Sequence, residues 1–295
     1  MRDIDDSVST KHTGHVGLGD HLCLPFASDL EQREVVSAYI ADGLVRGERV
    51  LYFSDRTAPG AIDAWLDPRG VDGALAVARG QLEIRPTADD HFDPGVVVGG
   101  IRDAVRDARA AGFQGLRLTG EMSWALRTLP DTVRLHEYES EVASTVTGSG
   151  DLAAICQYDE RLFDKADFSG LVALHPAVVR IDPLHDDRRL RIVPSFSPRG
   201  LRIAGTVDES TAGPFGEALT HTAGWPEPIV VIDLAELRFI DVAGIRTLVR
   251  AAEALPPDRA LHVRHLASTP HNVLRIAGWD PTPGLIIGDA GVPAT

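Results

Sequence analysis

Short strands with few charges alternate along this chain with amphipathic helices, and this alternation constrains the fold more than any other feature of the sequence. Strand-like runs such as RVLYF (49–53) and GLRLT (115–119) are separated by segments with a helical spacing of apolar residues. Ser28 and Glu31 have the spacing of a capping box at the start of one such segment. Strands that alternate with helices are typical of a mostly parallel sheet, so we predict an α/β fold.

The chain is long enough for two domains, and the character of the sequence changes near residue 181. It has 295 residues, of which 44% are hydrophobic and 24% charged. The stretch 181–198 contains three prolines (Pro183, Pro194 and Pro198) and the charged patch HDDRR, and it lacks a helical period. We therefore predict a disordered tail over 1–15, a first domain over 16–180, a linker over 181–198 in which LRIV is a candidate strand, and a second domain over 199–295.

The composition argues against two classes of protein. The net charge is −14 and both halves of the chain are acidic, so neither presents the basic face that nucleic acids need. No run approaches the roughly 18 apolar residues of a membrane span, and the polar segment MRDIDDSVSTKHTGH does not resemble a secretory signal. The basic residues are nearly all Arg, as in GC-rich bacterial genomes, and the only cysteines are Cys23 and Cys156. We therefore predict a cytoplasmic bacterial protein with reduced thiols.

The segment IVVIDLAELRFIDVAGIRTL, residues 229–248, is the most informative part of the second domain. A buried strand is followed by Asp-Leu, a short turn, Phe-Ile-Asp, a small residue and Gly. Asp241 precedes a helix, where its carboxylate can accept N–H bonds from the first turn. Together with LRIAGTVDESTAGPFGEAL and VLRIAGW, this order resembles the STAS domain, named after sulphate transporters and anti-sigma-factor antagonists, over essentially all of 199–295.

The STAS resemblance implies a small mixed sheet with helices on one side, and a protein that docks partners without catalysing a reaction. By resemblance, the partner is an anti-sigma factor of the serine-kinase type, which docks on the loop formed by Asp241, Val242, Ala243 and Gly244. The phosphoserine of switchable family members corresponds to Ala243, so this loop has no hydroxyl to phosphorylate at the family's site. The alternatives are that Asp241 only caps the helix and that the domain forms a homodimer.

The first domain carries GDHLCLPF, IADGLVRGERVLYFSD, TGEMSWAL, ICQYDERLF and ALHPAVV, in that order. The order and spacing of these segments resemble the MEDS domain of methanogen and methylotroph sensory proteins, over about residues 12–180. The resemblance implies a RecA-type α/β domain that senses a small-molecule ligand, for which small hydrocarbon derivatives have been suggested.

Polar, aromatic and sulphur-containing side chains of the first domain fall at or near the expected strand ends. Ligands of parallel sheets usually bind beyond the carboxyl ends of the strands. We therefore predict a ligand crevice lined by His21, Cys23, Glu121, Trp124, Cys156, Tyr158, Asp159 and His175. A structural role is the competing interpretation for several of them: Trp124 as a core aromatic, Cys156 as a buried small hydrophobe, Glu121 as a helix cap and His175 as a helix end.

Two further questions are whether the GDHLC segment binds a metal ion and whether the glycines around it bind a nucleotide. On an extended segment His21 and Cys23 share one face, and with Cys156 and His175 they would satisfy tetrahedral zinc, although H-x-C is not a zinc-site spacing. His21 and Cys23 are therefore the candidate metal ligands, and no cofactor is assigned. The stretch GHVGLGDHLC has three glycines but lacks the Lys and the hydroxyl of a phosphate-binding loop, which argues against ATP hydrolysis.

We therefore predict a non-catalytic regulator in which the first domain controls the docking module of the second. In this hypothesis, ligand or redox state at His21 and Cys23 replaces phosphorylation as the control. The alternative is a metal- or haem-binding sensor whose second domain serves dimerisation.

Overall fold

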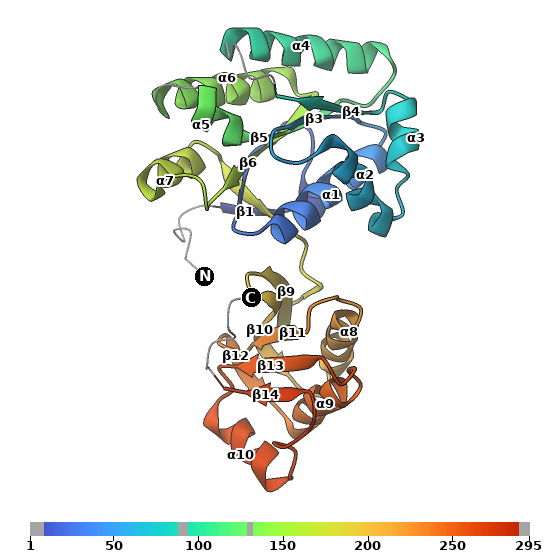
Figure 1. Ribbon diagram of the computed structural model, residues 1–295, viewed down its shortest axis with the longest axis vertical. Coiled ribbons are helices and arrows are strands. Elements are labelled where there is room, and N and C mark those ends of the chain that lie inside the picture. Colours follow the sequence, from blue (N-terminus) through green and yellow to red (C-terminus); the bar gives the residue numbers. More distant parts are fainter. Residues whose placement is uncertain (1–8, 88–93, 129–131, 289–295) are drawn as a thin grey trace. The chain divides into compact units, whose positions relative to one another are not determined.

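The computed structural model describes residues 9–87, 94–128 and 132–288, and the chain divides into two compact units (Figure 1). The boundary lies between Ile181 and Asp182. Each unit has its own hydrophobic core, and each is described by itself below.

The first unit is built on a seven-stranded sheet in which every pairing is parallel, as the alternation of strands and helices predicts. The strand order across the sheet is β1-β7-β2-β6-β5-β3-β4. The bounds are β1 (Ser9–His12), β2 (His21–Phe26), β3 (Arg49–Ser54), β4 (Leu82–Pro86), β5 (Leu116–Glu121), β6 (Leu152–Asp159) and β7 (Ala177–Arg180).

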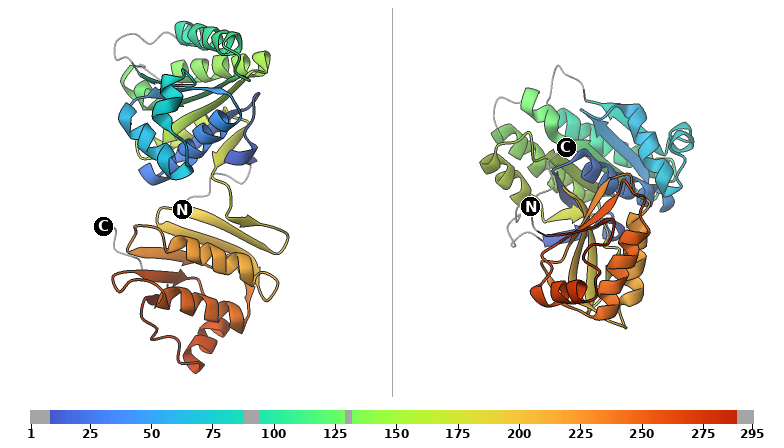
Figure 2. Two further views of the ribbon diagram at one scale, coloured as in Figure 1. Left: turned by 90° about the vertical axis from the view of Figure 1, so that its right-hand side faces the viewer. Right: turned by 60° about the horizontal axis from the view of Figure 1, so that its bottom comes forward.

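Helices cover both faces of this sheet, because the strands carry apolar side chains in both directions (Figures 1 and 2). One face packs against α1, α2 and α3, and the other packs against α4, α6 and α7. The bounds are α1 (Asp29–Val45), α2 (Pro59–Leu66), α3 (Gly73–Ala78), α4 (Pro94–Ala110), α5 (Ala125–Thr128), α6 (Thr132–Ser149) and α7 (Lys165–Ala173). Ser28 caps α1 by accepting from the Glu31 N–H, so the predicted capping box is confirmed.

The expectation of a disordered tail is wrong for residues 9–15. Ser9–His12 forms β1, which pairs with β7 at the edge of the sheet, and Thr13–His15 forms a short 3-10 helix. The side chains of β1 are exposed or half-buried, so the segment has no apolar pattern that marks it as a strand. The remainder of the predicted tail, residues 1–8, lies outside the described residues.

The second unit contains a mixed sheet in the order β14-β13-β11-β10-β9-β8, with β12 paired to β10 (Figure 2). The hairpins β8–β9 and β9–β10 are antiparallel and the other pairings are parallel. The bounds are β8 (His185–Asp186), β9 (Leu190–Phe196), β10 (Arg199–Val207), α8 (Ala212–Thr222), β11 (Ile229–Asp233), β12 (Leu237–Ile240), α9 (Val242–Glu253), β13 (Ala260–Arg264), α10 (Ser268–Ile276) and β14 (Leu285–Ile287).

The stretch 181–198 is part of the second unit and does not form the irregular linker that we expected. Half of it forms β8 and β9, and β9 pairs with β10 over its whole length, from Phe196 opposite Arg199 to Leu190 opposite Gly205. The prolines made this strand difficult to predict from the sequence. A proline is tolerated in a sheet only where its missing N–H is not needed, so Pro194 argued against a strand. The candidate strand LRIV is therefore confirmed as the start of β9.

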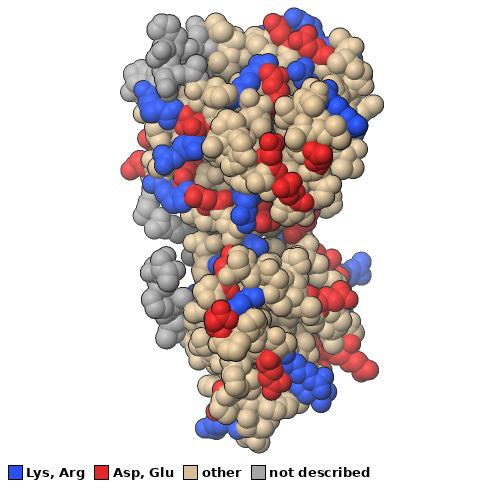
Figure 3. Space-filling view, turned by 45° about the vertical axis from the view of Figure 1, so that its right-hand side comes forward, with Lys and Arg blue, Asp and Glu red and all other residues tan. Residues whose placement is uncertain are grey.

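The surface in Figure 3 carries many charged side chains of both signs. Basic and acidic side chains are interspersed on the face that Figure 3 shows, with no broad basic area among the residues drawn there in colour. Within the part of the chain that the structure describes, no helix combines the length and the apolar character needed to cross a membrane.

Candidate functional site

Four side chains with metal-ligating or acid–base chemistry meet inside the first unit. His21 starts β2, Glu139 lies in α6, Cys156 lies in β6 and His175 follows α7, and all four are buried. Their ligating atoms all lie within 4.8 Å of one another. Glu139 Oε2 is 3.1 Å from His21 Nε2, 3.2 Å from Cys156 Sγ and 3.4 Å from His175 Nε2. We call this group the His–Glu–Cys–His cluster.

The cluster holds a buried carboxylate among groups that favour its ionised form. Burial by itself would raise the pKa of Glu139, but His175 and His21 lower that pKa below its ordinary value. The Tyr158 hydroxyl donates a hydrogen bond to Glu139 Oε1, which leaves Oε2 facing the other three groups. Burial, and then the negative charge of Glu139, raise the pKa of the Cys156 thiol, so in the metal-free protein this thiol is protonated.

The structure brings together four of the predicted crevice residues, His21, Cys156, Tyr158 and His175, but not Cys23. His21 and Cys23 both lie on β2 with one residue between them, but the sulphur of Cys23 is not among the four ligating atoms that lie within 4.8 Å of one another. Cys23 instead lies opposite Cys156 in the strand register and is buried in the apolar core. We predicted His21 and Cys23 as the candidate metal ligands. In the structure, His21 lies close to Cys156 and His175 instead.

Glu139 is the functional candidate that the sequence reasoning missed. It lies on the buried face of α6, whose other members include Leu135, Tyr138, Val142 and Val146. The sequence did contain a signal for it, because Glu139 is a charged residue at a position where the helical spacing predicts a buried apolar side chain. A buried Glu needs a partner, so it should have directed attention to the histidines.

The other predicted residues divide between the two faces of the sheet, because side chains alternate along a strand. Trp124 and Cys156 line an apolar cavity, whereas Glu121 and Asp159 line a separate polar one. The single crevice that we predicted is therefore two sites.

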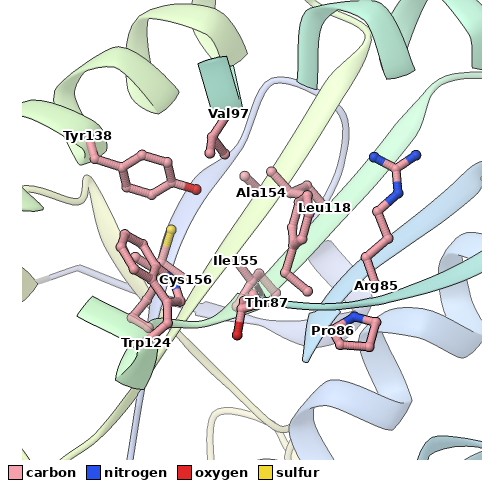
Figure 4. Close-up of a pocket in the computed structure, with 13 residues that line it drawn as sticks. Arg85, Pro86, Thr87, Val97, Leu118, Trp124, Tyr138, Ala154, Ile155 and Cys156 are labelled. Atoms are coloured by element: carbon pink, nitrogen blue, oxygen red, sulfur yellow. The ribbon is translucent and has the colours of Figure 1, made fainter. Parts of the chain in front are cut away.

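The apolar cavity has a volume of about 260 Å³ and lies on the face covered by α4 and α6. The sulphur of Cys156 points toward the ring of Tyr138 (Figure 4), and Trp124 packs edge-on against Tyr138 with the ring centroids 5.6 Å apart. Its lining includes Val97, Leu118, Trp124, Tyr138, Ala154 and Cys156. Because Cys156 also belongs to the His–Glu–Cys–His cluster, the cavity and the cluster share a side chain.

In the polar cavity, Glu121 has a structural role. Its carboxylate accepts hydrogen bonds from the Tyr52 hydroxyl at 2.7 Å and from the backbone N–H groups of Asp55, Arg56 and Thr57. The loop after β3 is thereby held against the end of β5. These hydrogen bonds indicate that Glu121 fixes the backbone of this loop, whereas we had predicted that it contacts a ligand.

The glycine-rich segment that we considered for phosphate binding precedes β2 and lies at the amino-terminal edge of the sheet. Parallel sheets bind ligands at the opposite edge, after the strands. There, β2 and α1 are joined by Ala27 and Ser28 alone, and the Ala27 N–H donates to the Glu31 carboxylate. Acidic and hydroxyl groups of the chain itself thus take up the backbone N–H groups of this turn.

Asp55, which follows β3, provides a test of the electrostatics of the polar cavity. Burial alone would raise its pKa, but hydrogen bonds from Arg127, Ser123 and Thr87 lower the pKa from 3.8 to about 2. A lowered folded-state pKa stabilises the fold above the ordinary pKa, and this contribution is lost as the pH falls from about 4 to about 2. Asp55→Asn is therefore expected to destabilise the first unit at pH 6, and the difference from the wild type should shrink below pH 4.

Urea unfolding at pH 6, 5, 4 and 3 measures this difference in stability. The control is Asp103→Asn, whose carboxylate pairs with Arg106 on the exposed surface of α4 and should give almost no difference at any pH. A gap between the wild type and Asp55→Asn that stays constant from pH 6 to pH 3 would contradict the prediction.

Of the four residues of the predicted docking loop, Asp241 lies between β12 and α9, and Val242, Ala243 and Gly244 form the first turn of α9 in the second unit. Asp241 caps α9, because its Oδ1 accepts from the Gly244 N–H at 2.7 Å, so its predicted capping role is confirmed. Val242 is 56% exposed, Phe239 near the end of β12 is 54% exposed, and Ala243 in the first turn of α9 is also exposed. We call Phe239, Val242 and Ala243 the loop patch.

Gly244 has an internal role. A Cβ atom at this position would lie 2.7 Å from Cγ1 of Val207 and 2.8 Å from Cγ1 of Ile240. The glycine therefore lets α9 pack closely on β10 and β12, whereas we had expected it to admit a partner.

Comparisons with known proteins agree with the two units. Residues 20–176 match the family model described as the MEthanogen/methylotroph, DcmR Sensory domain (MEDS), and residues 193–287 match the model described as Mlab, STAS domain. The chain is 27% identical over 169 residues to the transcriptional repressor DcmR of Methylorubrum extorquens. That match covers 57% of this chain and 62% of the repressor, so it leaves more than a third of the repressor unmatched.

Two solved structures show more distant likeness. An anti-sigma factor antagonist from Mycobacterium paratuberculosis is 21% identical and covers 33% of this chain and 83% of its own, with a TM-score of 0.29. A KaiC-like protein from the archaeon Pyrococcus horikoshii is 15% identical and covers 66% of this chain and 88% of its own, with a TM-score of 0.43.

Proposed function

The chain belongs to the family of MEDS sensory proteins, and we propose that its first unit is a receptor for a small, largely apolar molecule that controls protein docking by the STAS unit. The observation that carries this proposal is the apolar cavity of about 260 Å³ beside the His–Glu–Cys–His cluster.

The size and lining of the cavity support a small apolar ligand. A cavity of about 150 Å³ lined by apolar side chains is enough to bind benzene, so this one holds a molecule somewhat larger. Val97, Leu118, Trp124 and Ala154 supply apolar contacts, while Arg85, Thr87, Tyr138 and Cys156 supply a few polar atoms. Binding sites for small molecules generally combine such an apolar wall with a few oriented polar groups.

The loop patch supports a docking role for the second unit. Phe239 and Val242 are exposed apolar side chains beside the cap of α9, and an apolar anchor with a polar surround is typical of a protein interface. The partner that we propose is an anti-sigma factor of the serine-kinase type. Because Ala243 has no hydroxyl, phosphorylation at this position cannot release such a partner, and occupancy of the cavity takes over the control.

Control of this kind requires that the ligand bind two states of the protein with different affinity, and the coupling is reciprocal. A ligand that changes partner affinity tenfold supplies about 1.4 kcal/mol of coupling free energy. The relative DcmR is named as a transcriptional repressor. For this chain, an influence on transcription is part of the proposal.

The test measures the affinity of the full-length protein for serine-kinase-type anti-sigma factors of its source organism, with and without benzene as the probe. We expect about a tenfold change in affinity, which corresponds to about 1.4 kcal/mol. Ala154→Leu, which fills the cavity, should abolish the response to benzene. Ala110→Leu makes the same change on the exposed side of α4 and should preserve the response.

A fragment of residues 182–295 completes the design, because β8 and β9 belong to the second unit. It should bind the partner without responding to benzene. Equal affinities and equal responses in the fragment and the full-length protein would contradict control by the first unit.

A further inference from the structure

We propose that His21, Glu139, Cys156 and His175 form a four-coordinate site for a divalent cation of the zinc class. The inference deepens the proposed function, and its regulatory meaning depends on that function, because Cys156 also lines the ligand cavity. The site itself depends only on the geometry of the four side chains.

Four of the six separations within the cluster are close to those of a tetrahedral zinc site, and all six are within 4.8 Å. Ligands about 2.0–2.3 Å from one zinc ion at tetrahedral angles lie about 3.3–3.7 Å from one another. Glu139 Oε2 is 3.1, 3.2 and 3.4 Å from the ligating atoms of His21, Cys156 and His175, and Cys156 Sγ is 3.5 Å from His21 Nε2. Small outward shifts of the side chains would place a cation between all four atoms.

Surrounding groups orient two of the four ligands, His175 and Glu139, as metal sites require, whereas the buried Nδ1 of His21 has no partner among the described residues. His175 Nδ1 donates to the Leu171 carbonyl at 2.9 Å, so that its Nε2 presents a lone pair to the cluster. That Nε2 is buried and makes no hydrogen bond among the described residues, although Glu139 Oε2 is 3.4 Å away. Tyr158 holds the other oxygen of Glu139, which leaves one oxygen free to bind the cation.

The donor set selects the class of cation. A thiolate, a carboxylate and two neutral imidazoles carry two negative charges in total, which balance a divalent cation. Binding replaces the S–H bond of Cys156 by a sulphur–metal bond, and the proton leaves to solvent. Nitrogen and sulphur donors favour zinc over magnesium or calcium, which prefer oxygen.

Four protein ligands leave no open coordination position, so the site is of the structural or sensing type. The same arrangement argues against haem at this point. A haem iron accepts protein ligands only on the two sides of its macrocycle, whereas the ligating atoms of all four side chains lie within 4.8 Å of one another, which leaves no room for a macrocycle between them.

The test uses the full-length protein, stripped of metal and titrated with Zn²⁺ and with Co²⁺ as a coloured substitute. We expect one equivalent to bind, and the Co²⁺ form to show the visible bands of tetrahedral cobalt with a thiolate-to-metal band in the near ultraviolet. Cys156→Ser should remove the thiolate band and weaken binding at least 100-fold. Tyr158→Phe, which leaves every ligand in place, should weaken it about 10- to 100-fold.

Cys23→Ser is the matched control, because it removes the neighbouring buried thiol that lies outside the cluster. It should keep one equivalent of metal and the thiolate band. Circular dichroism of each variant separates loss of the site from loss of the fold, and Glu139→Gln provides a second ligand variant. No bound metal in the folded wild type, or a thiolate band that survives Cys156→Ser and disappears in Cys23→Ser, would overturn the proposal.

The measurement is independent of the partner assay described above. One equivalent of bound metal supports the site even where benzene has no effect on docking, and that second result bears on the proposed function alone. A response to benzene without any bound metal would support the receptor and overturn the metal site.

Discussion

Arg117→Met is expected to destabilise the first unit by about 3–5 kcal/mol, because it leaves a buried carboxylate without its partner. Arg117 lies in β5 and is fully buried, and its guanidinium pairs with Glu48. It also pairs with Asp42 at 2.7 Å and donates to the Tyr39 carbonyl at 2.9 Å. Glu48 is only 4% exposed, so water cannot replace the lost guanidinium.

Hydrogen exchange during urea unfolding measures this effect, since multi-domain proteins commonly do not unfold in one step and peptides of each unit report on that unit separately. The control is Arg106→Met, which removes the exposed pair with Asp103 on α4 and should cost less than about 1 kcal/mol. Adding Glu48→Gln to Arg117→Met should recover part of the loss. A loss below about 1 kcal/mol for Arg117→Met would show that the pair does not hold the unit together.

Val242→Asp is expected to weaken binding of the proposed partner, an anti-sigma factor, by about 30- to 100-fold, or about 2–3 kcal/mol. The substitution places a negative charge in the loop patch, next to the position where switchable relatives of the STAS type carry their phosphate. An acidic residue in the first turn of α9 agrees with the helix dipole, and Asp241 still caps the helix. The stability of the second unit should therefore be unchanged.

Isothermal titration calorimetry with the full-length protein measures the affinity. Ile276→Asp is the matched control, because Ile276 is also an exposed apolar residue of the second unit, at 83%, and lies in α10 outside the loop patch. It should bind the partner as the wild type does. Equal losses in the two variants would indicate a general effect of charge, and no loss in either would place the docking surface elsewhere.

Much of the fold could be predicted because its signals are local. The capping box of Ser28 and Glu31 and the cap at Asp241 are decided by hydrogen bonds that span three residues, and both are present. The apolar runs at β3, β5 and β6 are buried on both faces, as the strands of a parallel sheet must be. In contrast, β1 was missed, and β9 was placed in a linker with only LRIV as a candidate strand, because the pairing with β7 and with β10 is not visible in the residues of these segments alone.

The candidate site shows the same division. His21, Cys156 and His175 were recognised from their chemistry. Glu139 is 118 residues from His21 in the chain, and its place on the apolar face of a helix marks it as buried without saying which residues it meets. The prediction of a single crevice was wrong because alternate residues of β5 and β6 point to opposite faces of the sheet. The local sequence does not indicate which helices cover each face.

The sequence by itself determined the class of the fold, the presence of two domains, the helix caps and the absence of a phosphate acceptor at Ala243, because each depends on residue type or on contacts within one turn of the chain. Only the tertiary structure decided that His21 meets Cys156 and His175 around Glu139, that Cys23 stays outside this group, and that an apolar cavity adjoins it. Those relations depend on the order of the strands in the sheet and on the helices that cover it, and residues distant in the chain come together only when that order is set.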